Sequence, residues 1–235
     1  MMVRFWLALL LLSPWLLWQA KRTRATTPRL PEAGGAPSGQ SGEAGPALRL
    51  LVVGESTAAG VGVGDHQQGL AAHLAAQLSR RHGRTVLWRT VGVNGIRAAA
   101  LIGHLPRVPE TDVVIISLGV NDTTGLTRRR GYRHALTELI AELRRDKAEL
   151  PVYLLAVPPM QRFTALPRPL RDLLGWRARG LDQVQQELAR ALAGVHHLAY
   201  PPVEGKDLLA EDGYHPSEQG YAFIARTVAN NINVP

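Results

Sequence analysis

The amino-acid sequence predicts an α/β domain whose parallel β-sheet is covered by helices on both faces. Short, continuous apolar runs that stop at glycine-containing turns indicate strands buried on both sides, as in parallel sheets. Between these runs, apolar residues recur at intervals of three and four, which indicates helices with one apolar stripe. The two patterns alternate from residue 48 onward, and this order is typical of a parallel sheet with crossover helices.

The strands are predicted from the apolar runs. The first, at 48–53, stops at Gly54 and places Ser56 directly beyond it. Further strands are expected at 86–91, 112–118 and 152–156, with a shorter one at 196–199.

The helices are predicted from the spacing of apolar residues between the strands. Four groups have this spacing: Ala71, Leu74, Ala75 and Leu78; Leu136, Leu139, Ile140 and Leu143; Leu181, Val184, Leu188 and Leu192; and Tyr221, Ile224, Ala225 and Val228. A short helix is expected to end near residue 104, and the last group places the final helix at about 217–230.

The first 24 residues are predicted to be a signal peptide or a short membrane anchor. Their apolar run, residues 5–18, lies between Arg4 and the basic residues Lys21, Arg22 and Arg24. A run of about 14 residues suits the core of a signal peptide and is shorter than the roughly 20 residues that span a bilayer. Residues 3–20 would then associate with a membrane, and the domain would be membrane-anchored or exported to the periplasm or the extracellular space.

Residues 25–46 are rich in proline and glycine and contain almost nothing that could be buried, so we expect a disordered linker. The remainder, 47–235, has the size of one ordinary domain. The chain of 235 residues has no cysteine, which excludes a thiol nucleophile, a Cys-ligated zinc and disulfides. Its net charge of +8 is scattered, and its densest basic run, 128–130, contains no aromatic residues, so we expect no nucleic-acid partner.

Four short segments combine residues that could act together. Three of them follow predicted strands and the fourth precedes the last helix: 54–56, 92–95, 119–122 and 212–216. Turns after parallel strands gather at one edge of the sheet, so we expect these segments to share one cleft. Each also has an ordinary structural explanation, because Asn121-Asp122 and Asp212-Gly213 are common turn pairs and a serine after a strand often caps a helix.

Taken together, the segments fit nucleophilic acyl transfer. Ser56 is the candidate nucleophile, and His215 is the candidate base that would remove its proton. Asp212 would accept a hydrogen bond from the other ring nitrogen of His215 and set the tautomer. The oxyanion formed at the attacked carbonyl needs fixed donors, which the backbone N–H groups of Ser56 and Gly95 and the side-chain amide of Asn121 could supply. A glycine at position 95 also lets the backbone approach a ligand closely.

The same segments resemble the sequence blocks of the SGNH (GDSL-type) hydrolases. The serine block matches at Ser56, the glycine block at Gly95, the G-x-N-D block at Gly119, Asn121 and Asp122, and the D-x-x-H block at Asp212 and His215. The resemblance covers about residues 48–230 and implies a flavodoxin-like three-layer α/β/α fold with a five-stranded parallel sheet. It also implies an esterase, lipase or thioesterase that needs no cofactor. The chain departs from the family at Glu55, where aspartate is usual and the glutamate side chain is one methylene longer.

A serine esterase acting on a small-molecule or lipid ester is therefore the expected function. Met160, Phe163 and Leu166, in the loop after the fourth strand, and Trp176 are candidates for an acyl pocket, although plain core is an equally good explanation of each. No metal site is expected, because the adjacent His196 and His197 would point apart on a strand. The alternatives are an acyltransferase or a thioesterase with the same triad, or a non-catalytic envelope-binding module on the same fold.

Overall fold

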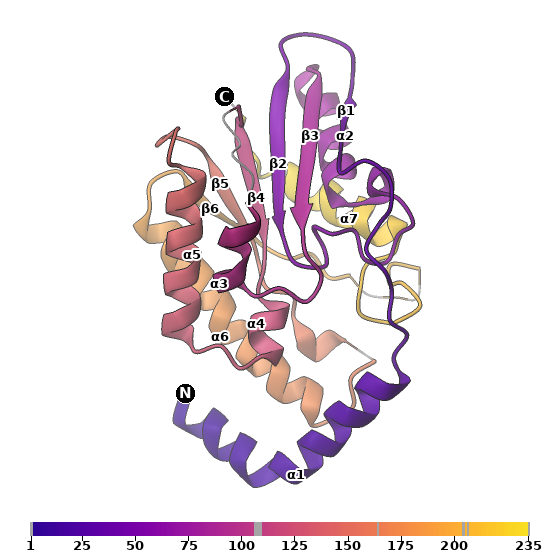
Figure 1. The fold of residues 1–235 in the computed structure, drawn as a ribbon, viewed down its shortest axis with the longest axis vertical. Helices are drawn as coiled ribbons and strands as arrows, with labels where there is room; N and C mark the ends of the chain where they lie inside the picture. The colour runs from indigo at the N-terminus through magenta and orange to yellow at the C-terminus, as the bar shows by residue number, and fades with distance from the viewer. Residues whose placement is uncertain (1, 106–109, 164, 204, 206, 235) are drawn as a thin grey trace.

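A six-stranded β-sheet with the strand order β1-β3-β2-β4-β5-β6 lies at the centre of the fold (Figure 1). The computed structural model describes residues 2–105, 110–163, 165–203, 205 and 207–234, without the side chains of residues 2–4, 6 and 8. Five strands are parallel to one another: β2 (Leu48–Gly54), β3 (Val86–Gly92), β4 (Val113–Ser117), β5 (Val152–Leu155) and β6 (Val195–Leu198). The predicted parallel α/β sheet is therefore confirmed.

The sixth strand was not expected. Strand β1 (Ser38–Ser41) pairs antiparallel with β3, so that Ser38 lies opposite Arg89 and Ser41 opposite Val86. It belongs to the segment 25–46, for which we expected a disordered linker, and here the structure corrects the prediction. Backbone hydrogen bonds rather than buried side chains hold this segment, and such bonds leave no apolar pattern in a sequence.

Helices cover both faces of the sheet. Two of them, α2 (Leu70–His82) and α7 (Glu218–Ala229), pack together on one face. The other face carries α3 (Ala98–Leu101), α5 (Arg129–Leu143) and α6 (Leu170–Ala191). Short helices lie in the connections between these elements: η1 (His66–Gln68), η2 (Ile102–His104), α4 (Val120–Thr124) and η3 (Met160–Arg162).

The sheet separates two hydrophobic cores, and β2 supplies both. Leu51 and Val53 belong to the core beneath α5 and α6, whereas Leu50 and Val52 belong to the core beneath α2 and α7. Successive side chains of a strand point to opposite faces, so a strand covered on both sides must be apolar at every position. This explains why the sequence shows continuous apolar runs and not an alternating pattern.

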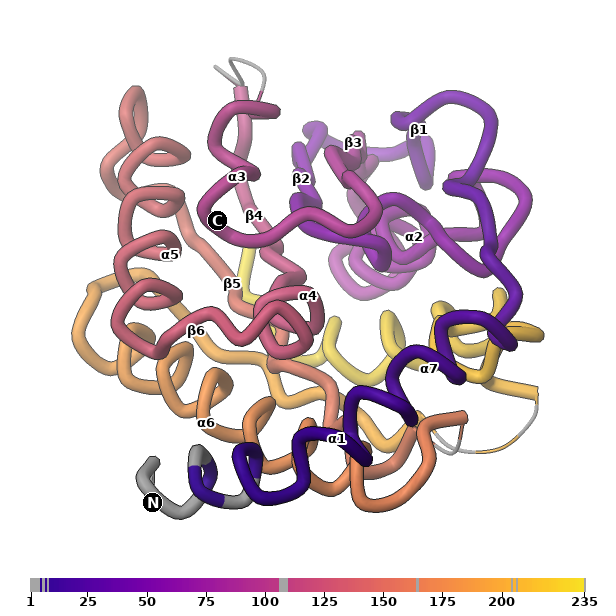
Figure 2. Tube along the Cα trace, turned by 60° about the horizontal axis from the view of Figure 1, so that its bottom comes forward, coloured from indigo at the N-terminus to yellow at the C-terminus, as the bar shows by residue number. Residues whose placement is uncertain are grey.

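Helix α1 (Met2–Thr26) packs against α6, below the sheet in the view of Figure 1 and on the side to which the arrow of β3 points (Figures 1 and 2). Phe5 and Leu16 are buried in the core that also contains residues of α5 and α6. The side chain of Arg4, which flanks the predicted signal or anchor, lies outside the described residues. Within the described part of the chain, no helix combines the length and the hydrophobicity needed to cross a bilayer.

Candidate active site

The strand order places three of the predicted segments side by side. Strand β2 lies between β3 and β4, and its last residue, Gly54, is paired with Gly92 on one side and Ser117 on the other. The turns that carry Ser56, Gly95 and Asn121 therefore leave three adjacent strands at the same edge of the sheet. A parallel sheet collects turns in this way because every strand ends on the same side.

Ser56 lies in a tight turn directly after β2. Its carbonyl oxygen accepts a hydrogen bond from the N–H of Val61 at 3.0 Å, and the residue is 8% exposed. Just before it, the N–H of Glu55 donates to the carbonyl of Ser117 at 3.0 Å. The turn is thus tied to the end of β4, and the position of Ser56 is set by backbone contacts on both sides.

The carboxylate of Glu55 joins this turn to the start of α4. Its two oxygens accept the N–H groups of Val120 and Asn121 at 2.8 and 2.9 Å, and the residue is 2% exposed. The first N–H groups of a helix have no partner within the helix, so a buried carboxylate is a suitable acceptor. Burial raises the pKa of Glu55 to about 7, although these backbone hydrogen bonds act in the opposite direction. Glu55 thereby positions Asn121 relative to Ser56.

Gly95 and its neighbours are held by two further carboxylates. Gly95 has a φ of 82°, a left-handed conformation that favours glycine, and a Cβ at this position would meet no atom within 4 Å. The carboxylate of Asp122 accepts the N–H of Ala98 at 2.9 Å, and that of Glu32 accepts the N–H of Asn94 at 2.6 Å. The turn is therefore fixed on both sides while the backbone of Gly95 stays open to a ligand.

The three predicted oxyanion donors are uncommitted. No described residue accepts a hydrogen bond from the backbone N–H of Ser56 or Gly95, or from the side-chain amide of Asn121. They are therefore free to bind a ligand at this edge of the sheet.

Asp212 and His215 form a hydrogen-bonded pair before α7. The Nδ1 of His215 lies 2.6 Å from Oδ2 of Asp212, and Oδ1 of Asp212 accepts the N–H groups of Tyr214 and His215. Burial would raise the pKa of Asp212, but the hydrogen bonds from the His215 ring and the two N–H groups outweigh it and hold the pKa below its usual range. With Nδ1 donating to an ionised carboxylate, Nε2 is the ring nitrogen left to accept a proton.

The segment that carries His215 packs against the turn that begins at Ser56. A Cβ built on Gly62 would lie 3.3 Å from Cβ of His215 and 2.4 Å from the carbonyl oxygen of Pro216. In addition, the hydroxyl of Tyr221, on α7, donates to the carbonyl of Val61 at 2.7 Å. Residues separated by about 160 positions in the sequence thus meet at this edge of the sheet.

Two of the candidates for an acyl pocket, Met160 and Phe163, have different surroundings. Met160 is 2% exposed and belongs to the hydrophobic core. Phe163 is partly buried and packs edge-on against Tyr214, the neighbour of His215, with 6.0 Å between the ring centroids. Phe163 therefore contacts the residue next to the candidate base, whereas Met160 is part of the core.

Three positioning carboxylates, Glu32, Glu55 and Asp122, were not assigned a role from the sequence. Glu55 carried a physical signal, since a charged residue directly after a strand buried on both faces requires a polar partner. Asp122 was recognised through its sequence block but without its partner, Ala98. Glu32 lies in the segment expected to be disordered and carried no signal.

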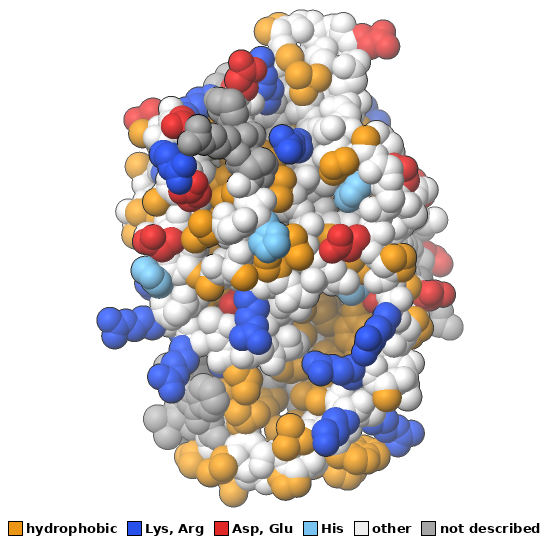
Figure 3. Space-filling model, in the orientation of Figure 1, with side chains coloured by type: hydrophobic (Ala, Val, Ile, Leu, Met, Phe, Trp, Pro, Cys, Tyr) orange, Lys and Arg blue, Asp and Glu red, His pale blue; other side chains and the backbone are white. Residues whose placement is uncertain are grey.

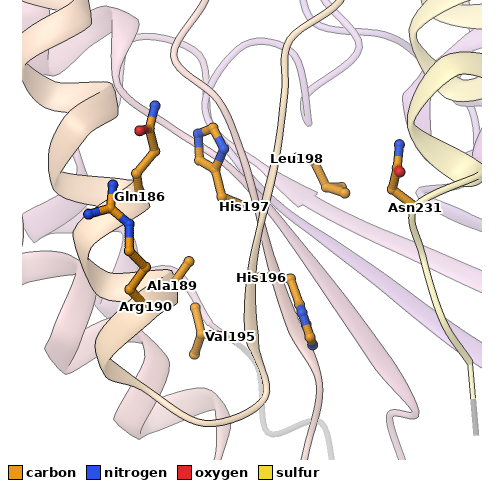
Figure 4. Close-up of a pocket in the computed structure, with 8 residues that line it drawn as sticks. All are labelled: Gln186, Ala189, Arg190, Val195, His196, His197, Leu198 and Asn231. Atoms are coloured by element: carbon orange, nitrogen blue, oxygen red, sulfur yellow. The ribbon is translucent and has the colours of Figure 1, made fainter.

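A cavity of about 400 Å³ lies beside the edge strand β6 (Figure 4). His196 and His197 leave the strand on opposite sides: His196 stacks on Tyr153, and His197 lies 2.9 Å from a carboxylate oxygen of Asp182. Neither of these histidines belongs to the four predicted segments. Among the described residues, no group of three or more His, Asp and Glu side chains is arranged to hold a metal ion.

Comparisons with known proteins agree with this architecture. The sequence model of the GDSL-like lipase/acylhydrolase family matches residues 52–223. A GDSL-like esterase of Mycobacterium tuberculosis, Rv1075c, is 27% identical over 188 residues, which cover 76% of this chain and 59% of that protein. The chain thus spans less than two thirds of the length of this curated relative.

Solved structures share the fold. The lipase Lip_vut3 from a goat rumen metagenome superposes with a TM-score of 0.65 at 18% identity, over 78% of this chain and 96% of the lipase. A family 3 carbohydrate esterase of Clostridium thermocellum superposes with a TM-score of 0.59 at 19% identity, over 77% and 93% of the two chains. This chain belongs to the GDSL-like lipase/acylhydrolase family, and the resemblance noted in its sequence is confirmed. Membership of this family supports a hydrolase.

Proposed function

We propose that the protein is a serine esterase that cleaves carboxylic esters through an acyl-enzyme intermediate. The observation that carries the proposal is the Asp212–His215 pair, packed against the turn of Ser56 at the edge where three hydrogen-bond donors are uncommitted. Such a set contains a nucleophile, an oriented base and donors for a developing negative charge, which are the parts that acyl transfer requires.

In the proposed reaction, Nε2 of His215 takes the hydroxyl proton as Oγ of Ser56 bonds to the ester carbonyl carbon. The carbonyl oxygen becomes an oxyanion, which the N–H groups of Ser56 and Gly95 and the amide of Asn121 stabilise; each such donor is worth about 3–4 kcal/mol of barrier. The carbon–oxygen bond to the alcohol then breaks, and the alcohol leaves with the proton from His215. Water repeats the sequence on the acyl-enzyme and releases the acid, while Asp212 keeps the imidazole oriented.

Replacement of the nucleophile tests this function. We expect Ser56→Ala to lower kcat for hydrolysis of p-nitrophenyl acetate and butyrate by about 10³-fold or more, because no other group can form the acyl-enzyme. Ser79→Ala, on α2, is the matched control and should keep full activity. Circular dichroism and the melting temperature should show that both variants are folded. Equal turnover by Ser56→Ala and the native protein would refute the proposal.

We also propose that residues 3–20 bind the surface of an anionic membrane through the outer face of α1. One face of this helix packs on the domain through Phe5, Leu16 and Gln19, whereas the opposite face exposes large apolar side chains. The exposed set comprises Leu7, Leu10, Leu11, Leu12, Trp15, Leu17 and Trp18. A helix of this kind, followed by exposed basic residues, suits the boundary between lipid headgroups and acyl chains.

Co-sedimentation with phosphatidylglycerol vesicles tests this association. Leu10 and Leu11 are 72% and 78% exposed, and we expect the double substitution Leu10→Ser/Leu11→Ser to weaken binding at least about tenfold through lost apolar burial. Leu87→Ser, which alters a leucine 37% exposed on β3, is the control and should bind as the native protein does. Equal binding by all three proteins would contradict the role of α1.

A further inference from the structure

The structure contains an apolar cavity of about 370 Å³ between α1 and the segments that carry the candidate catalytic residues. One wall comes from the approach to α6 and from its first turns and includes Leu166, Leu170 and Leu174. The opposite wall comes from the end of α1 and the residues after it, among them Ala20. A cavity of this size and lining suits an extended apolar ligand.

The cavity reaches the neighbours of two proposed catalytic groups. Tyr214, which lines it, directly precedes His215 and donates its N–H to Asp212. Thr124, which also lines it, lies one turn after Asn121 on α4, and its hydroxyl lies 3.3 Å from the carbonyl oxygen of Asn121. A ligand in the cavity would therefore extend away from the place where the ester carbonyl is expected.

The wall formed by α1 is attached to the wall formed by α6. The side-chain amide of Gln19 donates to the carbonyl of Arg168 at 2.6 Å and accepts the N–H of Leu170 at 3.2 Å. At the other end of the contact, Phe5 packs edge-on against Trp176 with 5.8 Å between the ring centroids. These contacts keep α1 in place against α6 and so define the width of the cavity.

The cavity opens to the surface between basic side chains. Arg24 and Arg29 line it, are exposed, and form no ion pair with a described residue. Figure 3 shows hydrophobic side chains around a hollow in the lower part of the molecule, with several Lys or Arg side chains beside it. Leu166 and Leu170 are buried and Leu174 is half-buried, so the apolar lining lies inside the cavity, behind these basic side chains.

We propose that this cavity binds the acyl chain of the ester, and that α1 is part of the substrate site. The inference rests on the proposed esterase function and adds to it a substrate class, esters of acyl chains longer than butyrate. Each methylene buried in the cavity should increase kcat/KM by about fourfold. Ala20, Thr23 and Arg24 of α1 would then help to determine chain-length specificity, in addition to any role of the helix at a membrane.

A pair of identical substitutions on α1 tests the assignment. We expect Ala20→Trp, which fills the cavity, to lower the ratio of kcat/KM for p-nitrophenyl dodecanoate to that for p-nitrophenyl butyrate at least tenfold. Ala25→Trp, on the same helix at an exposed position that does not line the cavity, should leave this ratio within about twofold of the native value. Assays run below the micelle concentration of the esters. Equal ratios for the two variants would overturn the proposal.

Binding of dodecanoate to the Ser56→Ala protein, followed by calorimetry, separates the cavity from the chemistry. We expect saturable binding that Ala20→Trp abolishes and Ala25→Trp keeps. Thr23→Phe, from the same wall of the cavity, is a second filling variant and should also abolish binding. It replaces Ala20→Trp in the experiment if that variant does not fold. If the native protein hydrolyses esters but dodecanoate binds all variants equally, the cavity assignment fails and the esterase stands. If dodecanoate binds as expected but Ser56→Ala does not reduce hydrolysis, the esterase fails and the cavity stands.

Discussion

Glu55 shows how much one side chain can contribute to the arrangement of a site. It stands between β2 and Ser56, and its two oxygens hold the first N–H groups of α4, so one carboxylate connects the nucleophile turn to the turn of Asn121. The longer glutamate side chain, where the family usually has aspartate, still reaches both N–H groups. Burial and the neighbouring charge of Asp122 raise its pKa, and the backbone hydrogen bonds lower it.

A stability change with pH follows from this residue. The pKa of Glu55 is about 7 in the folded protein and 4.5 in its ordinary state, so between these values the native state holds a proton that the unfolded state has released. Stability from this group is therefore fully present below about pH 4.5 and is lost as the pH rises through 7, by about 3 kcal/mol in total. Urea unfolding at several pH values, compared between the native protein and Glu55→Gln, measures it.

The comparison with Glu55→Gln is needed because other groups titrate in the same pH range or close to it. Burial lowers the pKa of His73, so the stability of the protein rises with pH just below 6.5, the ordinary pKa of histidine. The pKa of Asp212 is also lowered, so its stabilising charge is lost only below 3.8, the ordinary pKa of aspartate. Both contributions cancel in the difference between the two proteins. Identical slopes between pH 4.5 and 7 would show that Glu55 ionises normally.

At the scale of the element, α1 and β1 are held by contacts that involve few side chains. Strand β1 has the sequence SGQS and is attached by backbone pairing to β3, where a short polar edge strand also protects the sheet from pairing with another chain. Helix α1 is attached by Phe5, Leu16 and Gln19. Pro169 precedes α6 and supplies no side-chain cap, so the Gln19 oxygen accepts the N–H of Leu170 in its place.

The Gln19 bridge can be tested by substitution. We expect Gln19→Leu to lower the free energy of unfolding by about 1–3 kcal/mol, because the buried N–H of Leu170 and the partly buried carbonyl of Arg168 lose their partners while the volume is nearly kept. Lys21→Leu, an exposed position on the same helix, should change it by less than about 0.5 kcal/mol. Chemical denaturation of the two variants measures the difference, and equal midpoints would show that the bridge does not stabilise the docking of α1.

At the scale of the whole molecule, the central strands make the two cores one structure. Each of β2 and β4 sends alternate side chains into both cores, so neither core can come apart without exposing the other side of the same strands. The site lies at the edge where these strands end, and its geometry depends on both layers of helices.

Substitutions in the two cores should therefore have the same effect. Leu139 of α5 and Ile224 of α7 are fully buried on opposite sides of the sheet. We expect Leu139→Ala and Ile224→Ala each to lower the free energy of unfolding by about 2–5 kcal/mol. Thermal unfolding followed by tryptophan fluorescence and by circular dichroism should give one shared transition in each variant, and separate transitions would show that the cores unfold independently.

The candidate site was predicted to different extents at different residues. Gly95, Asn121 and His215 were recognisable because each lies in a short block of unusual composition at the end of a predicted element. Glu32 and Gln19 were not, because a polar residue in an irregular segment or on an apolar helix looks the same whether or not a distant backbone group pairs with it. The role of each residue depends on the distant backbone group with which it pairs, and the sequence does not show that pairing.

The sequence by itself determined the order of strands and helices and the family, since apolar periodicity and local blocks depend only on neighbouring residues. Tertiary structure alone decided that residues 38–41 extend the sheet, that α1 lies against α6, and that a cavity opens between them. These features depend on backbone pairing and on contacts between segments far apart in the chain, and neither leaves a periodic pattern in the residues involved.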